Sequence, residues 1–158
     1  MPTSARSTRK NNFTKSERLC SRKAIEALFA GGNRSCTAFP LRVVFRIVSD
    51  ETATVPAGLE TVPAKILISV SKRHFKHAVD RNRAKRQLRE AWRLNRYIIT
   101  DGTSLKGQEA TGLSCHKAQS LHIAFLWLAD EPQSSELVQR KMKNLLHRIK
   151  ENLCSDVS

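Results

Sequence analysis

The segment from Lys72 to Arg96 contains the residues of this chain that are best suited to bind phosphate groups. It holds ten lysines and arginines in 25 residues, against two acids, Asp80 and Glu90, which gives it a net charge of +8. The whole chain of 158 residues has a net charge of +14, so more than half of the excess lies in this segment. Such a concentration of charge in a segment that can fold predicts a polyanionic partner, and RNA or DNA is the usual one.

A helix from about His77 to Asn95 is predicted to display this charge, because that range contains neither glycine nor proline. At helical spacing, four apolar residues share one side and should pack on the rest of the protein: Ala84, Leu88, Ala91 and Trp92. The opposite half, with Asn82 among its members, carries the basic residues Arg83, Lys85, Arg86, Arg89, Arg93 and Arg96. Glu90 also lies there, and we expect it to pair with Arg86 or Arg93. Like charges one turn apart destabilise a helix by about 0.2–0.5 kcal/mol per pair. Because Glu90 is the one acid predicted in this basic half, the pattern favours a phosphate-binding face over a merely solvated one.

Three strands are predicted to position this helix, and their bounds are about Phe39 to Val48, Ala64 to Ser71 and Leu121 to Ala129. In the first strand, alternation places one set of side chains on one face: Leu41, Val43, Phe45 and Ile47. Arg42 and Arg46 point to the other face. The second strand is almost continuously apolar, which predicts a central strand covered on both faces.

Two further helices complete the predicted fold. The first runs from about Arg22 to Ala30, with Ser21 as its N-cap and Gly31 and Gly32 at its end. The last runs from about Glu136 to Leu153, with Ser135 as its N-cap. Its apolar stripe consists of Val138, Met142, Leu145, Leu146, Ile149 and Leu153. The order helix, strand, strand, basic helix, strand, helix predicts an α+β fold, a two-layer α/β sandwich in which helices pack on a small sheet.

The length of the chain fits one domain with one core. We expect residues 1–15 to be a flexible basic tail, residues 16–153 to form the domain, and residues from about 100 to 120 to be an exposed insertion. No apolar run approaches the roughly 20 residues of a membrane-spanning helix, and the N-terminus lacks the apolar region of a secretory signal. The four cysteines form no CxxC pair. This spacing predicts neither a zinc site nor a redox motif, and it favours reduced thiols in the cytoplasm.

The run from Ser69 to Arg93 resembles the signature of the bacterial ribonuclease P protein component. The matching parts are SVSKR at 69–73, AVDRNRAKR at 78–86 and LREAWR at 88–93. RNR followed by KR and then LRE, after a strand that ends in KR, is a specific pattern. The predicted elements from about residue 13 to 152 also follow the order of this family. The resemblance implies a small mixed sheet with a βαβ crossover around the RNR helix, a fold like ribosomal protein S5 domain 2. It also implies a left-handed crossover, where the general rule favours a right-handed one.

The resemblance implies a function as well. The chain would be the protein subunit of ribonuclease P, an endoribonuclease that removes the 5′ leader from precursor tRNA. Its partners would be the catalytic RNA subunit and precursor tRNA, with no membrane and no obligate protein partner. The catalytic centre would lie in the RNA subunit, with Mg²⁺ held mainly by that RNA and the substrate. We therefore expect this chain to contribute no catalytic residue and no metal ligand.

The resemblance assigns RNA binding to nine residues of the segment from Lys72 to Arg96. They are Lys72, Arg73, Arg81, Asn82, Arg83, Lys85, Arg86, Arg89 and Arg93. One stripe of this set, made of Arg81, Lys85 and Arg89 and flanked by Asn82, is assigned to the leader. Arg83, Arg86 and Arg93 are assigned to the catalytic RNA. A cleft between the sheet and the first helix would hold the single-stranded leader. Phe29 and, as a weaker candidate, Phe45 would stack on its bases.

Three other interpretations stay open on the sequence alone. A ribosomal or tRNA-binding protein would carry a similar basic face without a part in catalysis. A protein-only nuclease or metal enzyme would need a ligand set, and neither the pair His74 and His77 nor the adjacent Cys115 and His116 has a carboxylate cluster beside it. A DNA-binding helix in a major groove is the third, but a strand and not a helix-turn-helix pattern precedes the basic helix.

Overall fold

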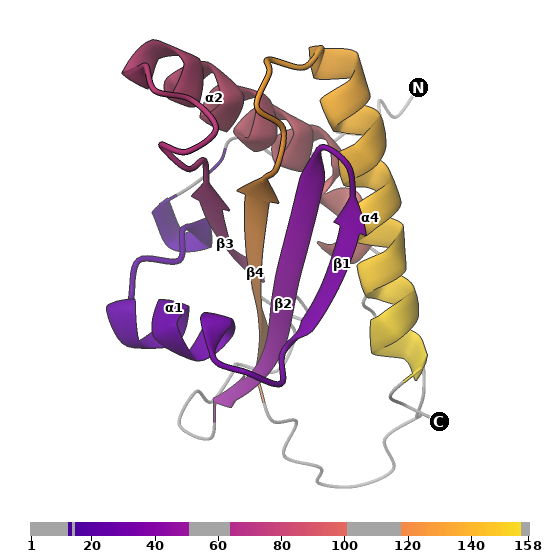
Figure 1. Cartoon of the computed structure of the whole chain (residues 1–158). Helices are drawn as coiled ribbons and strands as arrows, with labels where there is room; N and C mark the ends of the chain where they lie inside the picture. Colours follow the sequence, from indigo (N-terminus) through magenta and orange to yellow (C-terminus); the bar gives the residue numbers. More distant parts are fainter. Residues whose placement is uncertain (1–12, 14, 51–63, 101–117, 156–158) are drawn as a thin grey trace, which may run out of the picture.

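A four-stranded mixed sheet with the strand order β1-β2-β4-β3 forms the centre of the fold. The computed structural model describes residues 13, 15–50, 64–100 and 118–155 (Figure 1). The strands in sequence order are β1 (Arg34–Ala38), β2 (Leu41–Asp50), β3 (Ala64–Ser69) and β4 (Ala118–Trp127). Strands β1, β2 and β4 are antiparallel neighbours, and β3 runs parallel to β4. The predicted α+β class with a small mixed sheet is confirmed.

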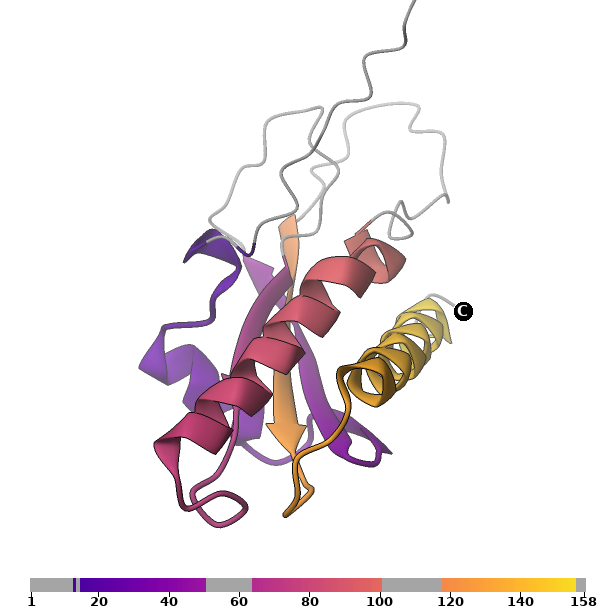
Figure 2. The ribbon, with the colours of Figure 1, turned by 90° about the horizontal axis from the view of Figure 1, so that it is seen from above.

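Helices lie on both faces of this sheet. The basic helix α2 (Ala78–Asn95) and the last helix α4 (Ser135–Ser155) pack side by side on one face, and α1 (Arg22–Phe29) lies on the other (Figures 1 and 2). Two short helices complete the set: η1 (Lys15–Glu17) and α3 (Tyr97–Thr100). Within the described part of the chain, no helix is both long and apolar enough to cross a membrane.

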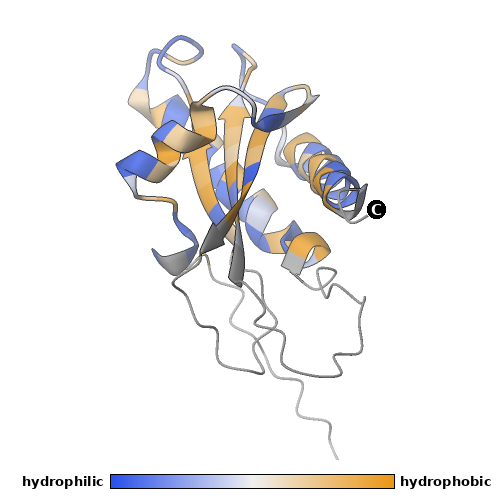
Figure 3. Ribbon diagram, turned by 90° about the horizontal axis from the view of Figure 1, so that it is seen from below, coloured by the Kyte–Doolittle hydropathy of each residue, from blue (hydrophilic) through white to orange (hydrophobic). Residues whose placement is uncertain are grey.

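The alternation of each strand divides the buried residues into two clusters. The larger cluster lies under α2 and α4 and takes its strand residues from β2, β3 and β4: Leu41, Val43, Phe45, Ala64, Ile66, Leu121, Ile123, Phe125 and Trp127. The smaller cluster lies under α1 and joins Leu19 and Leu28 to Val44 and Ala124. Hydrophobic residues are accordingly concentrated on the strands and on the helix sides that face them (Figure 3).

The ends of α1 agree with the sequence. The Ser21 hydroxyl accepts a hydrogen bond from the backbone N–H of Ala24. After the helix, Gly32 has a φ of 95°, which glycine adopts without steric cost. The Asn33 side-chain amide donates to backbone carbonyls at the end of the helix, including those of Leu28 at 2.6 Å and Ala30 at 3.0 Å. These bonds fix the path of the chain from α1 into β1.

The structure corrects three details of the predicted elements. Strand β1 was missed, and the chain turns at Phe39 and Pro40, where the predicted first strand began. Strand β3 was predicted to be central but lies at the edge of the sheet, where the backbone N–H of Leu19 donates to the Ile66 carbonyl at 2.9 Å. Ala64 and Ile66 are buried on one face of β3 and Leu67 is half-buried on the other, so the apolar character of this strand does not require a central position. The hydroxyl that caps α4 belongs to Ser134 and not to Ser135, because it accepts from the N–H of Leu137.

The connection from β3 through α2 to β4 is left-handed. With α2 toward the viewer and both strands pointing up, β4 lies to the left of β3, as follows from Figures 1 and 2. This is the handedness that the resemblance implied against the general rule. Most of the predicted basic tail at 1–15 and most of the predicted insertion at about 100–120 lie outside the described residues. At the end of that tail, Phe13 is half-buried against the larger cluster and Lys15 begins η1.

Candidate nucleic-acid interface

Helix α2 is fixed to the sheet by the four apolar residues that the sequence singled out. Ala84, Leu88, Ala91 and Trp92 are all buried. The Trp92 ring packs against Phe125 of β4 with a centroid distance of 6.0 Å. Because one side of the helix is held in the core, its other side must face outward, and the basic residues share that side.

The outward residues of α2 form a surface that we name the α2 basic face. Its exposed members are Asn82, Arg83, Arg86 and Arg89, and its half-buried members are Lys85 and Arg93. The spacing of RNR, KR and LRE along the helix thus places arginines on three successive turns. Arginine presents a planar fork of N–H donors that matches the oxygens of a phosphate. The α2 basic face is therefore suited to bind a chain of phosphates.

Glu90 is the acid within this face, and it pairs with Arg93. Arg93 Nε donates to Glu90 Oε2 at 2.9 Å, and Arg93 Nη2 also contacts Glu90 Oε1. The hydrogen bond from Arg93 lowers the pKa of Glu90 below its ordinary value, and the same bond raises the pKa of Arg93. Glu90 is thus ionised at neutral pH and neutralises one arginine of the face. Of the two partners expected for Glu90, the structure selects Arg93.

The two edges of α2 meet different parts of the protein. At one edge, Arg96 Nη1 lies 2.6 Å from Glu17 Oε1 of η1. At the other, Gln87 Nε2 donates to the Gln133 carbonyl at 2.9 Å and to the Ser135 hydroxyl at 3.1 Å, at the start of α4. Lys85 and Arg89 lie on the Arg96 edge by helical spacing. They are therefore placed toward η1 and the edge of β3 where Leu19 pairs with Ile66.

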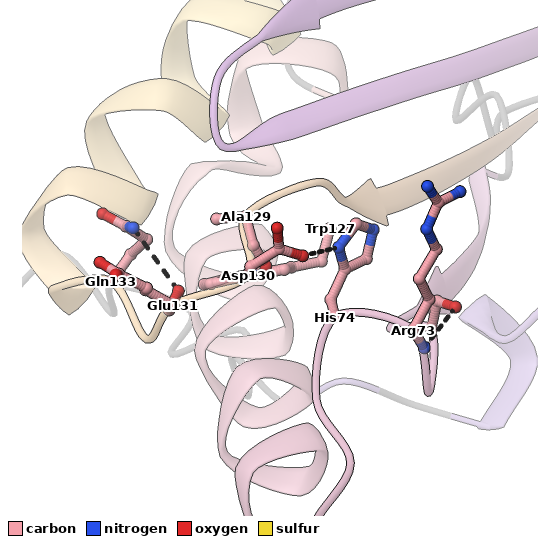
Figure 4. Close-up of polar contacts among 8 residues, drawn as sticks. Arg73, His74, Trp127, Ala129, Asp130, Glu131 and Gln133 are labelled. Atoms are coloured by element: carbon pink, nitrogen blue, oxygen red, sulfur yellow. Dashed lines mark hydrogen bonds and ion pairs between the residues drawn. The ribbon is translucent and has the colours of Figure 1, made fainter.

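The loop between β3 and α2 carries Lys72 and Arg73, and both side chains are exposed. His74 Nδ1 lies 2.7 Å from Asp130 Oδ1, which joins this loop to the loop after β4 (Figure 4). The Arg73 backbone N–H donates to the Ser71 hydroxyl at 3.1 Å. These contacts hold Lys72 and Arg73 beside the start of α2, so the described loop extends the basic surface.

Arg81 differs from the other arginines of the helix because its side chain supports the backbone. Its Nη1 donates to the carbonyls of Phe75 at 2.8 Å and Lys76 at 2.7 Å. The guanidinium thereby ties the loop to the first turn of α2. Its assignment to the leader stays a prediction, and any such contact must use its remaining N–H groups.

The sheet face toward α1 carries a second group of basic residues. Arg42 and Arg46 of β2 and Lys65 of β3 are exposed, and alternation places them on the same face as Val44 and Ala124. Arg46 and Lys65 both stand opposite His122 of β4 in the strand register, so they share one row across the sheet. The sequence indicated this face for the two arginines through alternation. The sequence did not predict that Lys65 lies on this face, because the position of β3 in the sheet depends on its pairing with β4.

The two phenylalanine candidates for the leader cleft lie in very different surroundings. Phe29, at the end of α1, is 47% exposed and is available to stack on a base. Phe45 is 2% exposed and lies in the core cluster under α2 and α4, on the opposite face of the sheet from α1. The assignment of Phe45 to the cleft was therefore wrong, because its neighbours Val44 and Arg46 are the residues that face α1.

Within the ranges that the structure describes, no three His, Cys, Asp or Glu side chains gather in a way that could hold a metal ion. The described part of the chain thus offers a binding surface of arginine and lysine, without a ligand set beside it. Such a surface can bind and position phosphates.

Comparison with known proteins places this arrangement in one family. Residues 13–106 match the family model described as Ribonuclease P. The chain is 36% identical to the ribonuclease P protein component of Porphyromonas gingivalis over 143 residues, which cover 90% of each protein. It is 32% identical to that of Chlorobium phaeobacteroides over 143 residues, 89% of each.

Solved structures share the fold. The RNase P protein of Staphylococcus aureus superposes with a TM-score of 0.56 at 17% identity, covering 86% of this chain and 97% of that one. The RNase P protein from Thermotoga maritima superposes with a TM-score of 0.55 at 22% identity, covering 84% of this chain and 96% of that one. The left-handed arrangement of strands and basic helix therefore lies within a known fold.

Proposed function

The chain belongs to the ribonuclease P protein family, and we propose that it is the protein subunit of a ribonucleoprotein endonuclease that removes the 5′ leader from precursor tRNA. The observation that carries the proposal is the α2 basic face, where the family's RNR, KR and LRE motifs are displayed from a helix anchored by four buried residues. A folded RNA is the partner that such a rigid row of arginines fits. The family match of residues 13–106 spans this helix.

The proposal assigns the two RNAs to opposite faces of the sheet. The α2 basic face, with Lys72 and Arg73, docks on the catalytic RNA. The leader lies on the other side, in the cleft between α1 and the sheet, where Phe29, Arg42, Arg46 and Lys65 can meet its bases and phosphates. Lys85 and Arg89, at the edge of α2 that faces η1, are placed nearest to the border between the two surfaces.

The proposal places the chemistry of cleavage in the RNA subunit. There, Mg²⁺ would activate water for attack on the phosphodiester and would be held mainly by the RNA and the substrate. The described residues of this chain do not fit Mg²⁺, since they form no cluster of carboxylates. The protein would act in the cytoplasm by binding both RNAs, and it would lower the Mg²⁺ concentration that cleavage requires because its cations offset repulsion between their phosphates.

Reconstitution tests the proposal. The purified full chain is mixed with a ribonuclease P RNA and a 5′-labelled precursor tRNA at an Mg²⁺ concentration where the RNA alone cleaves slowly. We expect a large gain in leader release, and no cleavage when the protein is present without the RNA. An unchanged rate with the RNA would leave the chain as an RNA-binding protein of another kind, such as a ribosomal one. Cleavage by the protein alone would place the active site in this chain.

A further inference from the structure

Helix α4 presents a second basic surface, on the side opposite its buried stripe of Val138, Met142, Leu145, Leu146 and Ile149. Four exposed residues of the outward side, Arg140, Lys143, Asn144 and His147, form what we name the α4 face. Ser135–Ser155 as a whole contains five lysines and arginines against two acids, Glu136 and Glu151. The helix thus has a net charge of +3 without counting His147.

Within the described part of the chain, no acidic side chain neutralises the cations of the α4 face. No lysine or arginine of α4 forms an ion pair with another residue of the described ranges, whereas Arg93 and Arg96 of the neighbouring helix both do. Arg148 donates a hydrogen bond from Nη1 to the Thr37 carbonyl at 3.1 Å. It therefore turns toward β1, while Arg140 and Lys143 are left to an external anion.

The position of α4 indicates which external anion Arg140 and Lys143 would bind. Helices α2 and α4 pack together on one face of the sheet, and Gln87 joins the middle of α2 to the start of α4. Helices α2 and α4 thus lie on the same side of the sheet, with α1 on the other side (Figure 2), and each buries its apolar stripe so that its basic residues face outward. An RNA that lies along α2 meets α4 as well, and a leader held beside α1 does not.

A membrane surface fits the α4 face poorly. A helix that lies on a membrane inserts its apolar side between the lipids. The apolar side of α4 is committed to the core, and no large hydrophobic residue of the helix is among the exposed ones in the described ranges. Charge without exposed apolar surface is the pattern of a phosphate-backbone contact.

We propose that the α4 face is a second contact for the catalytic RNA, in which Arg140 and Lys143 bind two backbone phosphates beyond the region docked on α2. This inference rests on the proposed function, since it names the partner of a further surface. His147 and Asn144, one turn further along the helix, extend the same contact as hydrogen-bond donors to phosphate or ribose oxygens.

The test compares two double variants of the full chain that lose the same charge. Arg140→Ala with Lys143→Ala removes the α4 cations, and Arg22→Ala with Lys23→Ala removes two exposed cations of α1. Binding to the isolated ribonuclease P RNA is measured by fluorescence anisotropy at several salt concentrations, at a fixed Mg²⁺ concentration. Circular dichroism and thermal unfolding verify that both variants fold, which we expect because all four side chains are exposed.

The α4 variant should lower the slope of log affinity against log salt by about 1.4–1.8, since each lost phosphate contact contributes about 0.7–0.9. When salt rises from about 50 to 200 mM, the affinity of both proteins decreases. The fold decrease of the α4 variant should be about ten times smaller than that of the wild type. The α1 variant should keep the wild-type slope.

Three results would overturn the inference while leaving the proposed function in place. The first is a wild-type slope in the α4 variant. The second is an equal loss in both variants, which would mean that only net charge matters. The third is a loss confined to the binding of leader-bearing precursor tRNA by the assembled holoenzyme, which would assign the α4 face to the leader. If the wild-type chain itself fails to bind the catalytic RNA, the proposed function fails together with the inference.

Discussion

Replacing Glu90 with glutamine should strengthen the binding of the catalytic RNA, although Glu90 lies in the middle of the α2 basic face. In the free protein its carboxylate holds Arg93 through two contacts. The substitution removes the negative charge, keeps the size of the side chain and removes the ion pair with Arg93. Both effects make the face a better partner for phosphates.

The expected magnitude is modest. A unit charge about 8 Å from a phosphate in water changes the association constant by about twofold. One additional phosphate contact by Arg93 would steepen the slope of log affinity against log salt by about 0.7–0.9. We therefore expect a two- to fivefold lower Kd at low salt, together with a steeper salt dependence. Exposed ion pairs contribute little to folding, so thermal unfolding should change only slightly.

The pH of the assay must keep the wild-type pair intact. Because Arg93 lowers the pKa of Glu90, the carboxylate is ionised in the folded protein at neutral pH. The contribution of the pair to stability is present above the pKa of an unfolded glutamate and is lost as the pH falls through the lowered value of the folded state. Neutral pH therefore compares a formed pair with a removed one.

Glu26→Gln is the matched control. Glu26 forms a similar pair on α1, where Arg22 Nε lies 3.0 Å from Glu26 Oε1, on the far side of the sheet. Binding of both variants to the isolated catalytic RNA is measured by anisotropy across a salt series. A weaker affinity for Glu90→Gln would show that the carboxylate orients Arg93 for binding, and an equal gain in both variants would reduce the effect to net charge. Either outcome refutes the reasoning.

Three further predictions concern the α2 basic face, the leader side and the end of α1. Arg83→Ala with Arg86→Ala should weaken binding of the catalytic RNA and reduce its salt slope by about 1.4–1.8, and an unchanged slope would remove these two arginines from the docking surface. Phe29→Ala should raise the KM of the reconstituted enzyme for precursors with long leaders and spare mature-tRNA binding, because its exposed ring lies on the side of the sheet proposed to hold the leader; a KM that rises equally for short leaders would contradict the stacking role. Asn33→Ala should lower the free energy of unfolding by about 1–3 kcal/mol in urea titrations, since it leaves carbonyls at the end of α1 unpaired.

The helices were largely predictable because their signals are local. The bounds of α2 and its buried stripe follow from spacing that one turn of helix fixes, and the same holds for α4. Strand β1 was not predicted because RSCTA contains no large apolar residue, and only Cys36 and Ala38 of this strand are half-buried while its other residues are exposed. The edge position of β3 could not be read from the chain, since its apolar residues are buried by α2 on one side and by η1 and α1 on the other. Neighbour relations in a sheet depend on distant segments, and spacing along one segment does not report them.

The partnership of Glu90 with Arg93, rather than with Arg86, also lay beyond the sequence. Both arginines are within one turn of Glu90, at i+3 and i−4, and both spacings allow contact. The choice depends on side-chain rotamers, and the structure places Arg93 in the orientation in which its Nε and Nη2 meet both carboxylate oxygens. The pattern of charges therefore predicts that a pair forms, and three-dimensional packing decides which arginine remains free for RNA.

The case of Phe45 shows why a residue role taken from a resemblance must agree with the periodicity of its own strand. Side chains of a strand alternate between two faces, so Phe45 must share the face of Leu41 and Val43, which are both fully buried. The same alternation places Arg46 on the face that α1 covers in part. A one-residue shift in the register of β2 would exchange these roles, but it would expose the apolar set and is excluded by the pairing of Phe45 with Ile123. If this face holds the leader as proposed, its contacts from the sheet would come mainly from cations, and base stacking would come from α1.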